Sequence, residues 1–171
     1  MCAAEFTLKE QERCTIYIVD DDASILRLYQ KLLRDLDATF KSFTSAREFM
    51  ESYSPGPHEC LICDVRSPET GGLRALRELT AMGACPPVIF ASADQDVPSI
   101  VKAMKAGAFD VLEKPVDSVR PQASARSALE HSRTLHCVRR ETGARQARLA
   151  LLTPKERKIA EWVVANNPQS S

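Results

Sequence analysis

Apolar and polar positions follow a repeated order along the first two thirds of the chain. Short apolar runs rich in β-branched and aromatic residues are each followed by a segment whose apolar residues recur at helical spacing. Five such repeats predict an α/β fold, with a parallel sheet covered by helices on both faces. The predicted strands are 15–19, 39–43, 60–63, 87–91 and 110–113; the predicted helices begin near 25, 46, 73 and 97, and a fifth follows the last strand.

The pattern changes after residue 117, to one long and sparsely apolar helix that reaches toward Leu149, with Gly143 as a candidate break. A further helix is expected from Thr153, with Thr153 as N-cap and Glu156 closing a capping box; Ser45 and Glu48 repeat this pattern earlier in the chain. We divide the chain into an N-terminal extension (1–13), an α/β domain (14–125), a helical basic linker (126–150) and a C-terminal segment (151–171).

Polar residues stand where four of the predicted strands end. Asp20 and Asp21 follow the first strand, Asp64 the third, Ser92 the fourth and Lys114 the fifth. In open parallel sheets, ligands bind outside the carboxyl ends of the strands. These side chains are therefore expected to form one site.

Phosphoryl transfer to a carboxylate fits this set of residues. It needs a nucleophile, a divalent cation, and positive or hydrogen-bonding groups for the phosphoryl oxygens. Asp64 is the candidate nucleophile, and with Asp20 and Asp21 it offers the carboxylates that Mg²⁺ prefers. Lys114 can pair with Asp64 and then with the phosphoryl group.

The two residues that follow the fourth predicted strand complete the candidate site. The Ser92 hydroxyl can donate to a phosphoryl oxygen, and the small side chain of Ala93 leaves the donor's approach open. Each feature alone has a simpler explanation: Asp22 is expected to be a helix N-cap, and an isolated Lys-Pro pair is usually a loop. Four such features at successive strand ends favour a site.

Net charge and hydropathy restrict the possible functions less than the strand-end residues do. The formal net charge is zero, so nothing global indicates nucleic acid or membrane. No apolar run approaches the length of a transmembrane helix, and the N-terminus lacks the apolar core of a secretory signal, so a cytoplasmic protein is expected. The linker is locally basic, and is either a solvated extension of the preceding helix or a dimerising or DNA-approaching helix. The basic stretch begins just before the linker and contains Arg120, Arg126, Arg133, Arg139, Arg140, Arg145 and Arg148.

The cysteines do not indicate a metal site. Cys60 and Cys63 form a CxxC pair inside a predicted buried strand. Positions i and i+3 of a strand point to opposite faces, so the two thiols cannot share a metal ion. Small buried thiols are the favoured interpretation.

The ordered motifs resemble the receiver domains of two-component response regulators, and more narrowly the FixJ/LuxR-type subfamily, over about residues 13–125. The resemblance is carried by 17–22 (YIVDDD), 64–68 (DVRSP), Ser92, 96–98 (DVP), 103–108 (AMKAGA) and 113–115 (EKP). It implies a flavodoxin-like (βα)5 fold with strand order 2-1-3-4-5 and an extended C-terminal helix.

The resemblance also implies a mechanism. A sensor histidine kinase would phosphorylate Asp64; Mg²⁺ would be held by Asp20, Asp21, Asp64 and the backbone carbonyl of Arg66. The Lys114–Pro115 bond would be cis, and Ser92 would move toward the phosphoryl group. Such a protein is a switch and not an enzyme, apart from self-catalysed phosphorylation and dephosphorylation. A homodimer through the receiver's fourth helix, fifth strand and fifth helix, or through the linker helix, is a further expectation.

A second resemblance and one departure concern the output. Residues 152–157 (LTPKER) look like the opening of a LuxR-type helix-turn-helix domain, with only the first helix within this sequence, so DNA binding would need a domain not complete here. The family usually has an aromatic residue three positions before the lysine, and this chain has Val111 there. Phe109 is expected on the same strand face as Val111, and we expect Val111 to weaken coupling to the output face.

Two other function classes are alternatives. A stand-alone receiver would bind a partner or act as a phosphate sink without DNA binding. A phosphatase of the dehalogenase-like superfamily would want a second aspartate two residues after the nucleophile, where this chain has Arg66.

Overall fold

The computed structural model describes residues 14–65, 72–83, 85–93, 97–115 and 119–150, and six positions beyond them: 153, 155, 156, 158, 159 and 162. The chain divides into two compact units, residues 1–134 and 135–171. The first contains the whole sheet.

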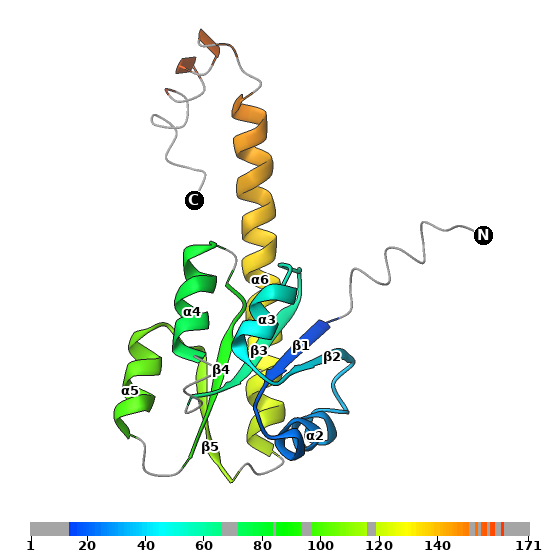
Figure 1. Cartoon of the computed structure of the whole chain (residues 1–171). Coiled ribbons are helices and arrows are strands. Elements are labelled where there is room, and N and C mark those ends of the chain that lie inside the picture. The colour runs from blue at the N-terminus through cyan, green and yellow to red at the C-terminus, as the bar shows by residue number, and fades with distance from the viewer. Residues whose placement is uncertain are drawn as a thin grey trace, which may run out of the picture. The chain divides into compact units, whose positions relative to one another are not determined.

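Five parallel strands form one sheet in the order β2-β1-β3-β4-β5, which confirms the predicted fold class. Consecutive strands are joined by helices, as parallel pairing requires. Figure 1 shows the strands side by side with helices on either side. The strands are β1 (Cys14–Val19), β2 (Ala38–Phe43), β3 (Glu59–Asp64), β4 (Val88–Ala93) and β5 (Asp110–Lys114).

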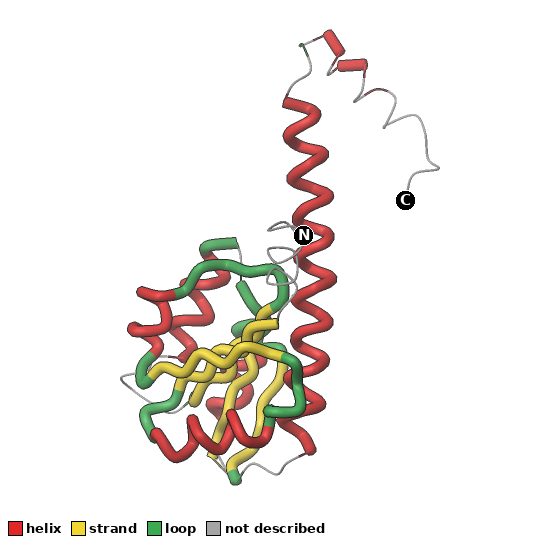
Figure 2. The backbone as a smooth tube through the Cα atoms, turned by 90° about the vertical axis from the view of Figure 1, so that its right-hand side faces the viewer, coloured by secondary structure: helices red, strands yellow, loops and turns green. Residues whose placement is uncertain are grey.

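The helices cover both faces of the sheet (Figures 1 and 2). One core cluster joins the sheet to α2 (Ala23–Leu32) and to the first half of α6 (Val119–Ala150). The other joins it to α3 (Ala46–Ser52), α4 (Gly72–Ala81) and α5 (Val97–Lys105). We call these the α2/α6 face and the α3/α4/α5 face.

Alternation along β3 separates the two cysteines as predicted. Cys60 is buried on the α2/α6 face and Cys63 on the α3/α4/α5 face. Burial raises the pKa of both thiols, to about 12 for Cys63. They are buried core residues that cannot bind one metal ion together.

Predicted helix caps are confirmed. The Asp22 carboxylate accepts from the Ser24 N–H at 2.7 Å at the start of α2, and Ser45 Oγ accepts from the Glu48 N–H at 3.2 Å at the start of α3. In return, the Glu48 carboxylate accepts from the N–H of Thr44 at 3.0 Å. Thr44 is the residue before the cap. These bonds satisfy N–H groups that a helix start leaves without partners.

The long helix differs from the prediction at Gly143. α6 runs without interruption from Val119 to Ala150, so the candidate break was wrong. A glycine inside a helix costs about 1 kcal/mol relative to alanine, and a helix of 32 residues tolerates that cost.

Polar bonds tie the first half of α6 to three elements. Ser124 Oγ donates to Asp110 of β5 at 2.7 Å, and Gln122 Nε2 donates to the Leu32 carbonyl of α2 at 2.7 Å. Ser132 Oγ accepts from the backbone N–H of Glu59 at 3.0 Å. The residues that follow the predicted domain boundary at 125 therefore pack on the sheet as well.

Phe109 does not lie on the same face as Val111. Val111 packs against the α3/α4/α5 core, whereas Phe109 packs against the α2/α6 core and stacks on His131 of α6, with ring centroids 5.4 Å apart. The pleat did not apply because β5 begins at Asp110, one residue after Phe109. Val111 therefore has no aromatic neighbour two residues back on its own face. The Lys114–Pro115 bond is cis, as expected.

Other expectations fall partly outside the described residues. The N-terminal extension and the loop 66–71 lie outside them. In the second unit, Thr153 and Glu156 form the predicted capping box: the Thr153 N–H donates to Glu156 Oε2 at 2.8 Å, and the Glu156 N–H to Thr153 Oγ1 at 3.4 Å. The five described positions that follow Thr153 are helical, while the predicted end near 165 is not described.

Candidate functional site

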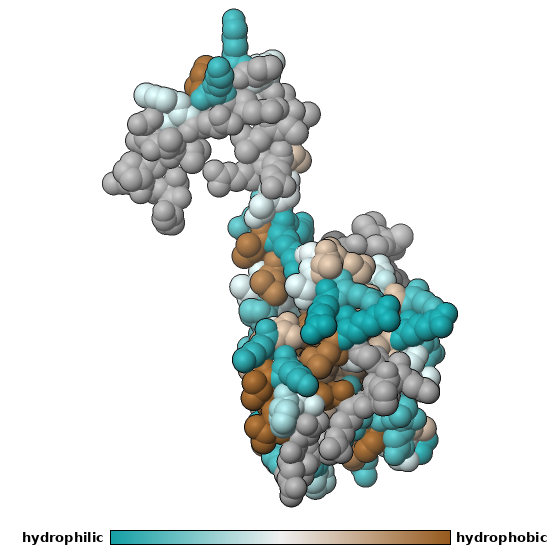
Figure 3. Space-filling view, turned by 60° about the vertical axis from the view of Figure 1, so that its left-hand side comes forward, coloured by the Kyte–Doolittle hydropathy of each residue, from teal (hydrophilic) through white to brown (hydrophobic). Residues whose placement is uncertain are grey.

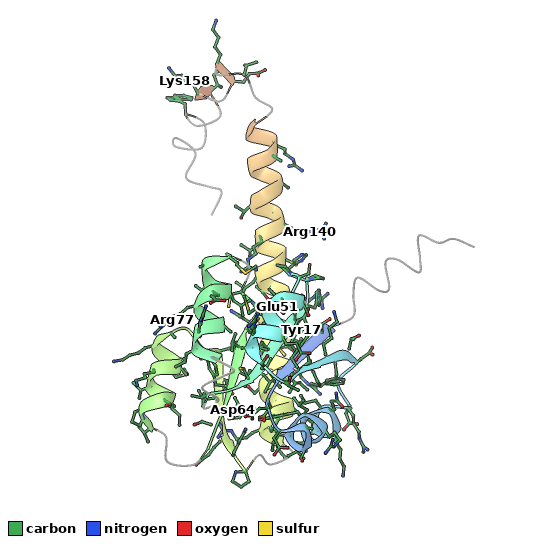
Figure 4. All side chains as sticks on the ribbon, in the orientation of Figure 1. Tyr17, Glu51, Asp64, Arg77, Arg140 and Lys158 are labelled. Atoms are coloured by element: carbon green, nitrogen blue, oxygen red, sulfur yellow. The ribbon has the colours of Figure 1, made fainter. Side chains whose placement is uncertain are left out.

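Three carboxylates meet at the carboxyl edge of the sheet. Asp20 and Asp21 follow β1, and Asp64 ends β3, the next strand in the sheet. One oxygen from each lies within 4.8 Å of the others, a spacing suited to a metal ion. Asp20 is buried, Asp64 half-buried and Asp21 exposed, so the cluster opens to solvent on one side. We call Asp20, Asp21 and Asp64 the acidic cluster; Figure 4 labels Asp64 at the lower end of the strands.

Strand alternation and Lys114 determine which way two of these carboxylates point. Ile62 belongs to the α2/α6 core, and side chains two apart on a strand share a face, so Asp64 extends from the α2/α6 face. Asp20 follows the last residue of β1, and its carboxylate lies beside that of Asp64, because Lys114 Nζ contacts both. Leu112 places Lys114 on the same face by the same rule.

Lys114 pairs with two members of the cluster. Its Nζ donates to Asp20 Oδ2 at 2.9 Å and lies 3.4 Å from Asp64 Oδ2. Burial acts to lower the pKa of Lys114, but the hydrogen bond that Lys114 donates to Asp20 and the charge of Asp64 outweigh it, so the pKa is raised. Lys114 is therefore a fixed positive charge within reach of the candidate nucleophile.

Backbone bonds hold the strand ends in place. The N–H of Asp22 donates to Asp20 Oδ1 at 3.0 Å, so both Asp20 oxygens have donors. The N–H of Asp20 donates to the Phe43 carbonyl at 3.2 Å, and that of Val65 to the Ala91 carbonyl at 3.0 Å. The carboxylates of Asp20 and Asp64 are thus carried by anchored backbone.

The donor set fits a small divalent cation. Among the described residues, three carboxylates face one ammonium group, and these four groups together carry an excess of negative charge. Mg²⁺ is bound in proteins by one or two carboxylates together with waters and phosphate oxygens, and the exposed side of the cluster at Asp21 leaves room for such ligands.

Ser92 lies at the same edge but is turned differently. It follows Ala91, the β4 residue paired with Asp64. Val88 and Phe90 belong to the α3/α4/α5 core, so alternation turns Ser92 toward that face, and it is completely buried. The structure thus brings Asp20, Asp21, Asp64 and Lys114 together and leaves Ser92 beside them on the other face. The side chain of Ala93 and all of Arg66 lie outside the described residues.

Gly72 was not among the predicted site residues. It begins α4, and a Cβ there would lie 2.9 Å from the Asp64 carbonyl oxygen and 2.9 Å from Cys63 Sγ. Real Cβ atoms do not approach so closely, so only glycine lets α4 pack this near the nucleophile's backbone. The glycine pair 71–72 was the one signal in the sequence.

Tyr29 is a second residue that sequence reasoning missed. It occupies a core position of α2 with an exposed fraction of 1%, among leucines of the same apolar stripe. Its hydroxyl is the buried side-chain polar atom that lacks a hydrogen-bond partner among the described residues. A tyrosine at a position where the stripe otherwise has leucine was the available signal.

A buried acid of another kind begins β3. Glu59 Oε1 accepts from the Tyr53 hydroxyl at 2.6 Å, and Oε2 from the Gly56 N–H at 3.1 Å. Its backbone N–H donates to Ser132 of α6. This carboxylate is saturated by hydrogen bonds at the edge opposite the acidic cluster.

The helices of the described residues include none that is both long and apolar enough to cross a membrane. The long helix α6 fails on composition, because arginines recur along it.

Comparison with known proteins places the chain in a family. The model of the response regulator receiver domain matches residues 16–126. The response regulator protein TmoT of Ectopseudomonas mendocina is 40% identical over 123 residues, which are 72% of this chain and 56% of that protein. The transcriptional regulatory protein FixJ of Azorhizobium caulinodans is 35% identical over 155 residues, which are 90% of this chain and 72% of that protein.

Solved structures agree. The response regulator StyR superimposes with a TM-score of 0.69 at 31% identity, covering 91% of this chain and 78% of that one. Full-length FixJ from B. japonicum gives 0.63 at 32% identity, covering 90% and 75%. The chain spans about half the length of several curated relatives it matches. With its 2-1-3-4-5 sheet and its acidic edge, the chain belongs to the response regulator receiver family.

Proposed function

We propose that this protein is a two-component response regulator whose receiver accepts a phosphoryl group on Asp64 from a sensor histidine kinase in a Mg²⁺-dependent reaction. The observation that carries the proposal is the meeting of Asp20, Asp21 and Asp64 with Lys114 at one strand edge. Membership of the receiver family supports it.

The chemistry follows from the positions of these groups. A carboxylate oxygen of Asp64 attacks the phosphorus of a phosphohistidine as the phosphorus–nitrogen bond breaks; the imidazole keeps the electron pair and takes up a proton. Asp20, Asp21, Asp64 and the Arg66 carbonyl would hold Mg²⁺, which would supply positive charge for the phosphoryl oxygens. Lys114, 3.4 Å from Asp64 Oδ2, is placed to pair with a phosphoryl oxygen after transfer.

Ser92 has the role of sensing the product. Its hydroxyl is buried beside the strand end, so donation to a phosphoryl oxygen requires that its side chain reorient toward the α2/α6 face. The small Ala93 keeps the approach to Asp64 open. The reaction is stoichiometric phosphorylation followed by hydrolysis, and the protein is a switch with no metabolic substrate.

A direct test uses acetyl phosphate as phosphoryl donor. Wild type incubated with acetyl phosphate and Mg²⁺ should gain the mass of one phosphoryl group in intact-protein mass spectrometry, and Asp64→Asn should gain none. Asp35→Asn is the matched control, because Asp35 is an exposed acid near the end of α2 paired with its neighbour Arg34. Wild type that gains no mass, or Asp64→Asn that still does, contradicts the proposal.

We propose further that phosphorylation switches dimerisation and transcription. The match to a transcriptional regulatory protein extends over 155 residues, well past the receiver, and residues 152–157 resemble the start of a helix-turn-helix domain. In the receiver, α5 exposes the apolar side chains Val97, Val101 and Met104, and Figure 3 shows apolar surface on the side of the molecule brought forward there. The dimer would use the face of α5, β5 and α6, or the second half of α6.

Light scattering with and without the phosphate mimic beryllofluoride tests this output. A shift from monomer to dimer supports it, and Val101→Asp should prevent the shift while leaving phosphoryl uptake intact. Phosphoryl uptake without any change of mass in solution would instead favour a stand-alone receiver acting as a phosphate sink or partner-binding module. Small rearrangement of the output face is expected, because Val111 replaces the usual aromatic residue.

A further inference from the structure

The hydroxyl of Tyr29 is buried and has no hydrogen-bond partner. Among the residues that the structure describes, the other buried side-chain polar atoms have partners. A buried hydroxyl that donates no hydrogen bond destabilises the folded state. Such a group in a core position, where leucine would fit the stripe, calls for an acceptor in another state of the protein.

Tyr29 lies on the helix that begins beside the acidic cluster. Tyr29 lies two turns after the N-cap Asp22, on the buried stripe of α2. Long side chains in a helix lean toward its N-terminus, which here is the end that carries Asp20. Tyr29 shares the α2/α6 core with Ile18 and Ile62, the residues two before Asp20 and Asp64.

The electrostatics agree with this placement. Burial raises the pKa of Tyr29 above its ordinary value, and the negative charges of Asp20 and then Asp64 raise it further. Both acids therefore lie within electrostatic reach of the phenol. The hydroxyl stays protonated and can act as a neutral donor.

In the present arrangement each Asp20 oxygen accepts one hydrogen bond. Lys114 donates to Oδ2 and the Asp22 N–H donates to Oδ1. A divalent cation bound by the cluster would repel the Lys114 ammonium and take its place beside Oδ2. The Asp20 carboxylate would then turn toward the cation, and because each carboxylate oxygen can accept more than one bond, a lone pair would face a donor on the α2 side.

We propose that Tyr29 is a positioning residue for the cation-loaded site, its hydroxyl donating to the Asp20 carboxylate when a divalent cation displaces Lys114 from it. This inference rests on the proposed function, because it assumes that the cluster binds Mg²⁺. Tyr29 acts through Asp20 and does not touch the phosphoryl group. The Tyr29 bond would hold Asp20 in the orientation that the cation requires.

The experiment compares two tyrosine-to-phenylalanine variants. Tyr29→Phe removes the unbonded hydroxyl, and Tyr53→Phe removes a hydroxyl that already donates to Glu59 at the opposite edge. Each is measured by thermal unfolding in EDTA and by calorimetric titration with Mg²⁺. The two variants differ in whether the lost hydroxyl is bonded in the metal-free state, so they should change stability in opposite directions.

The expected pattern is specific. Metal-free Tyr29→Phe should melt a few degrees higher than wild type, about 2–5 °C, because an unsatisfied polar group is removed. Its Mg²⁺ dissociation constant should rise about tenfold, the value of one lost hydrogen bond to a charged group. Tyr53→Phe should melt lower than wild type and bind Mg²⁺ within about twofold of it, since it leaves the acidic edge untouched.

Three results would overturn the inference. Tyr29→Phe with wild-type Mg²⁺ affinity would show that the hydroxyl does not serve the loaded site. A lower melting temperature for metal-free Tyr29→Phe would show that the hydroxyl is already bonded, for instance by an internal water. Wild type that binds no Mg²⁺ and gains no phosphoryl mass would remove the proposed function and this inference together, whereas the first two results leave the proposed function standing.

Discussion

One strand carries an acid at each end, and the surroundings of the two acids differ in hydrogen bonding and in charge. Glu59 begins β3 and accepts hydrogen bonds from Tyr53 and Gly56 at 2.6 and 3.1 Å. Asp64 ends β3 among two further carboxylates, with Lys114 at 3.4 Å. Both acids are at least half removed from solvent. The first is a saturated anchor, while the second belongs to a group whose charge is incompletely balanced.

The difference shows how a fold separates stability from reactivity. A buried carboxylate whose two oxygens each accept from a neutral donor is held in one orientation, and removing one donor leaves an oxygen unsatisfied. A crowded set of carboxylates lowers stability through repulsion and becomes favourable when a cation arrives. The sheet places these two situations at opposite edges, with the apolar residues 60–63 between them.

Exchange of the two acids for amides should give crossed results, and this is the largest effect expected. Glu59→Gln should lose about 2–3 kcal/mol of unfolding free energy. The glutamine nitrogen cannot accept, so one of the two donors, the Tyr53 hydroxyl or the Gly56 N–H, loses its acceptor. It should still gain one phosphoryl group. Asp64→Asn should lose phosphoryl uptake and become more stable without metal, by about 1 kcal/mol, as repulsion in the cluster falls.

Chemical denaturation in EDTA measures the unfolding free energy of the two variants, and intact-protein mass spectrometry measures their phosphoryl uptake. Equal losses of stability in the two variants would contradict the distinction between a saturated and an unbalanced acid. So would a loss of phosphoryl uptake in a folded Glu59→Gln protein.

Gly72 and Gly143 offer a second contrast. Gly72→Ala should cost about 2 kcal/mol, because its Cβ would meet the Asp64 carbonyl at 2.9 Å. Gly143→Ala should stabilise the protein, by up to about 1 kcal/mol, because nothing lies within 4 Å of a Cβ on that helix. Denaturation curves measure the two values, and phosphoryl uptake should slow in Gly72→Ala alone. A neutral Gly72→Ala would show that α4 moves away at little cost.

The anchor at the Glu59 edge can be weakened from α6. Ser132→Ala removes the acceptor of the Glu59 N–H, and we expect a loss of about 1 kcal/mol. Ser127 is exposed on the same helix, so Ser127→Ala should stay within about 0.5 kcal/mol of wild type. Hydrogen exchange should rise at the Glu59 amide in the first variant and stay at its wild-type rate in the second. Unchanged protection there would show that Ser132 contributes nothing to the anchor.

The smallest effect is a dependence on alkaline pH. Burial, followed by the neighbouring Cys14 and Glu59, raises the pKa of the Cys60 thiol above its ordinary value of 9.0. The folded state therefore favours the protonated thiol, and its contribution to stability is complete below that value and lost as pH rises above it. Between about pH 8 and pH 10, the unfolding free energy of wild type should fall by about 1 kcal/mol relative to that of Cys60→Ala. Parallel stability curves for the two proteins would contradict this.

Much of the site could be predicted because short-range sequence patterns mark its residues. Each polar residue follows an apolar run directly, and in a parallel sheet all such ends meet at one edge, so position along the chain already implied proximity for Asp20, Asp64 and Lys114. The caps at Asp22, Ser45 and Thr153 were equally local, because a cap depends on a few neighbouring residues.

The errors and omissions arose where distant parts of the chain decide the outcome. Phe109 was assigned to the wrong face because the start of β5 depends on its pairing with β4. The bond from Glu59 to Ser132 joins residues 73 apart, and no local pattern marks either one. Gly143 was overrated as a break because one unfavourable residue matters little in a long helix.

The sequence by itself determined the five strand–helix repeats, the buried thiols and the acids at the strand ends, since hydrophobic periodicity and capping are properties of short segments. The tertiary structure alone decided how those acids are treated. Lys114 bridges Asp20 and Asp64, Tyr53 and Gly56 saturate Glu59, and Tyr29 is buried with its hydroxyl unbonded. Hydrogen bonding and charge balance depend on which side chains meet in space, and only the packed sheet and helices bring these together.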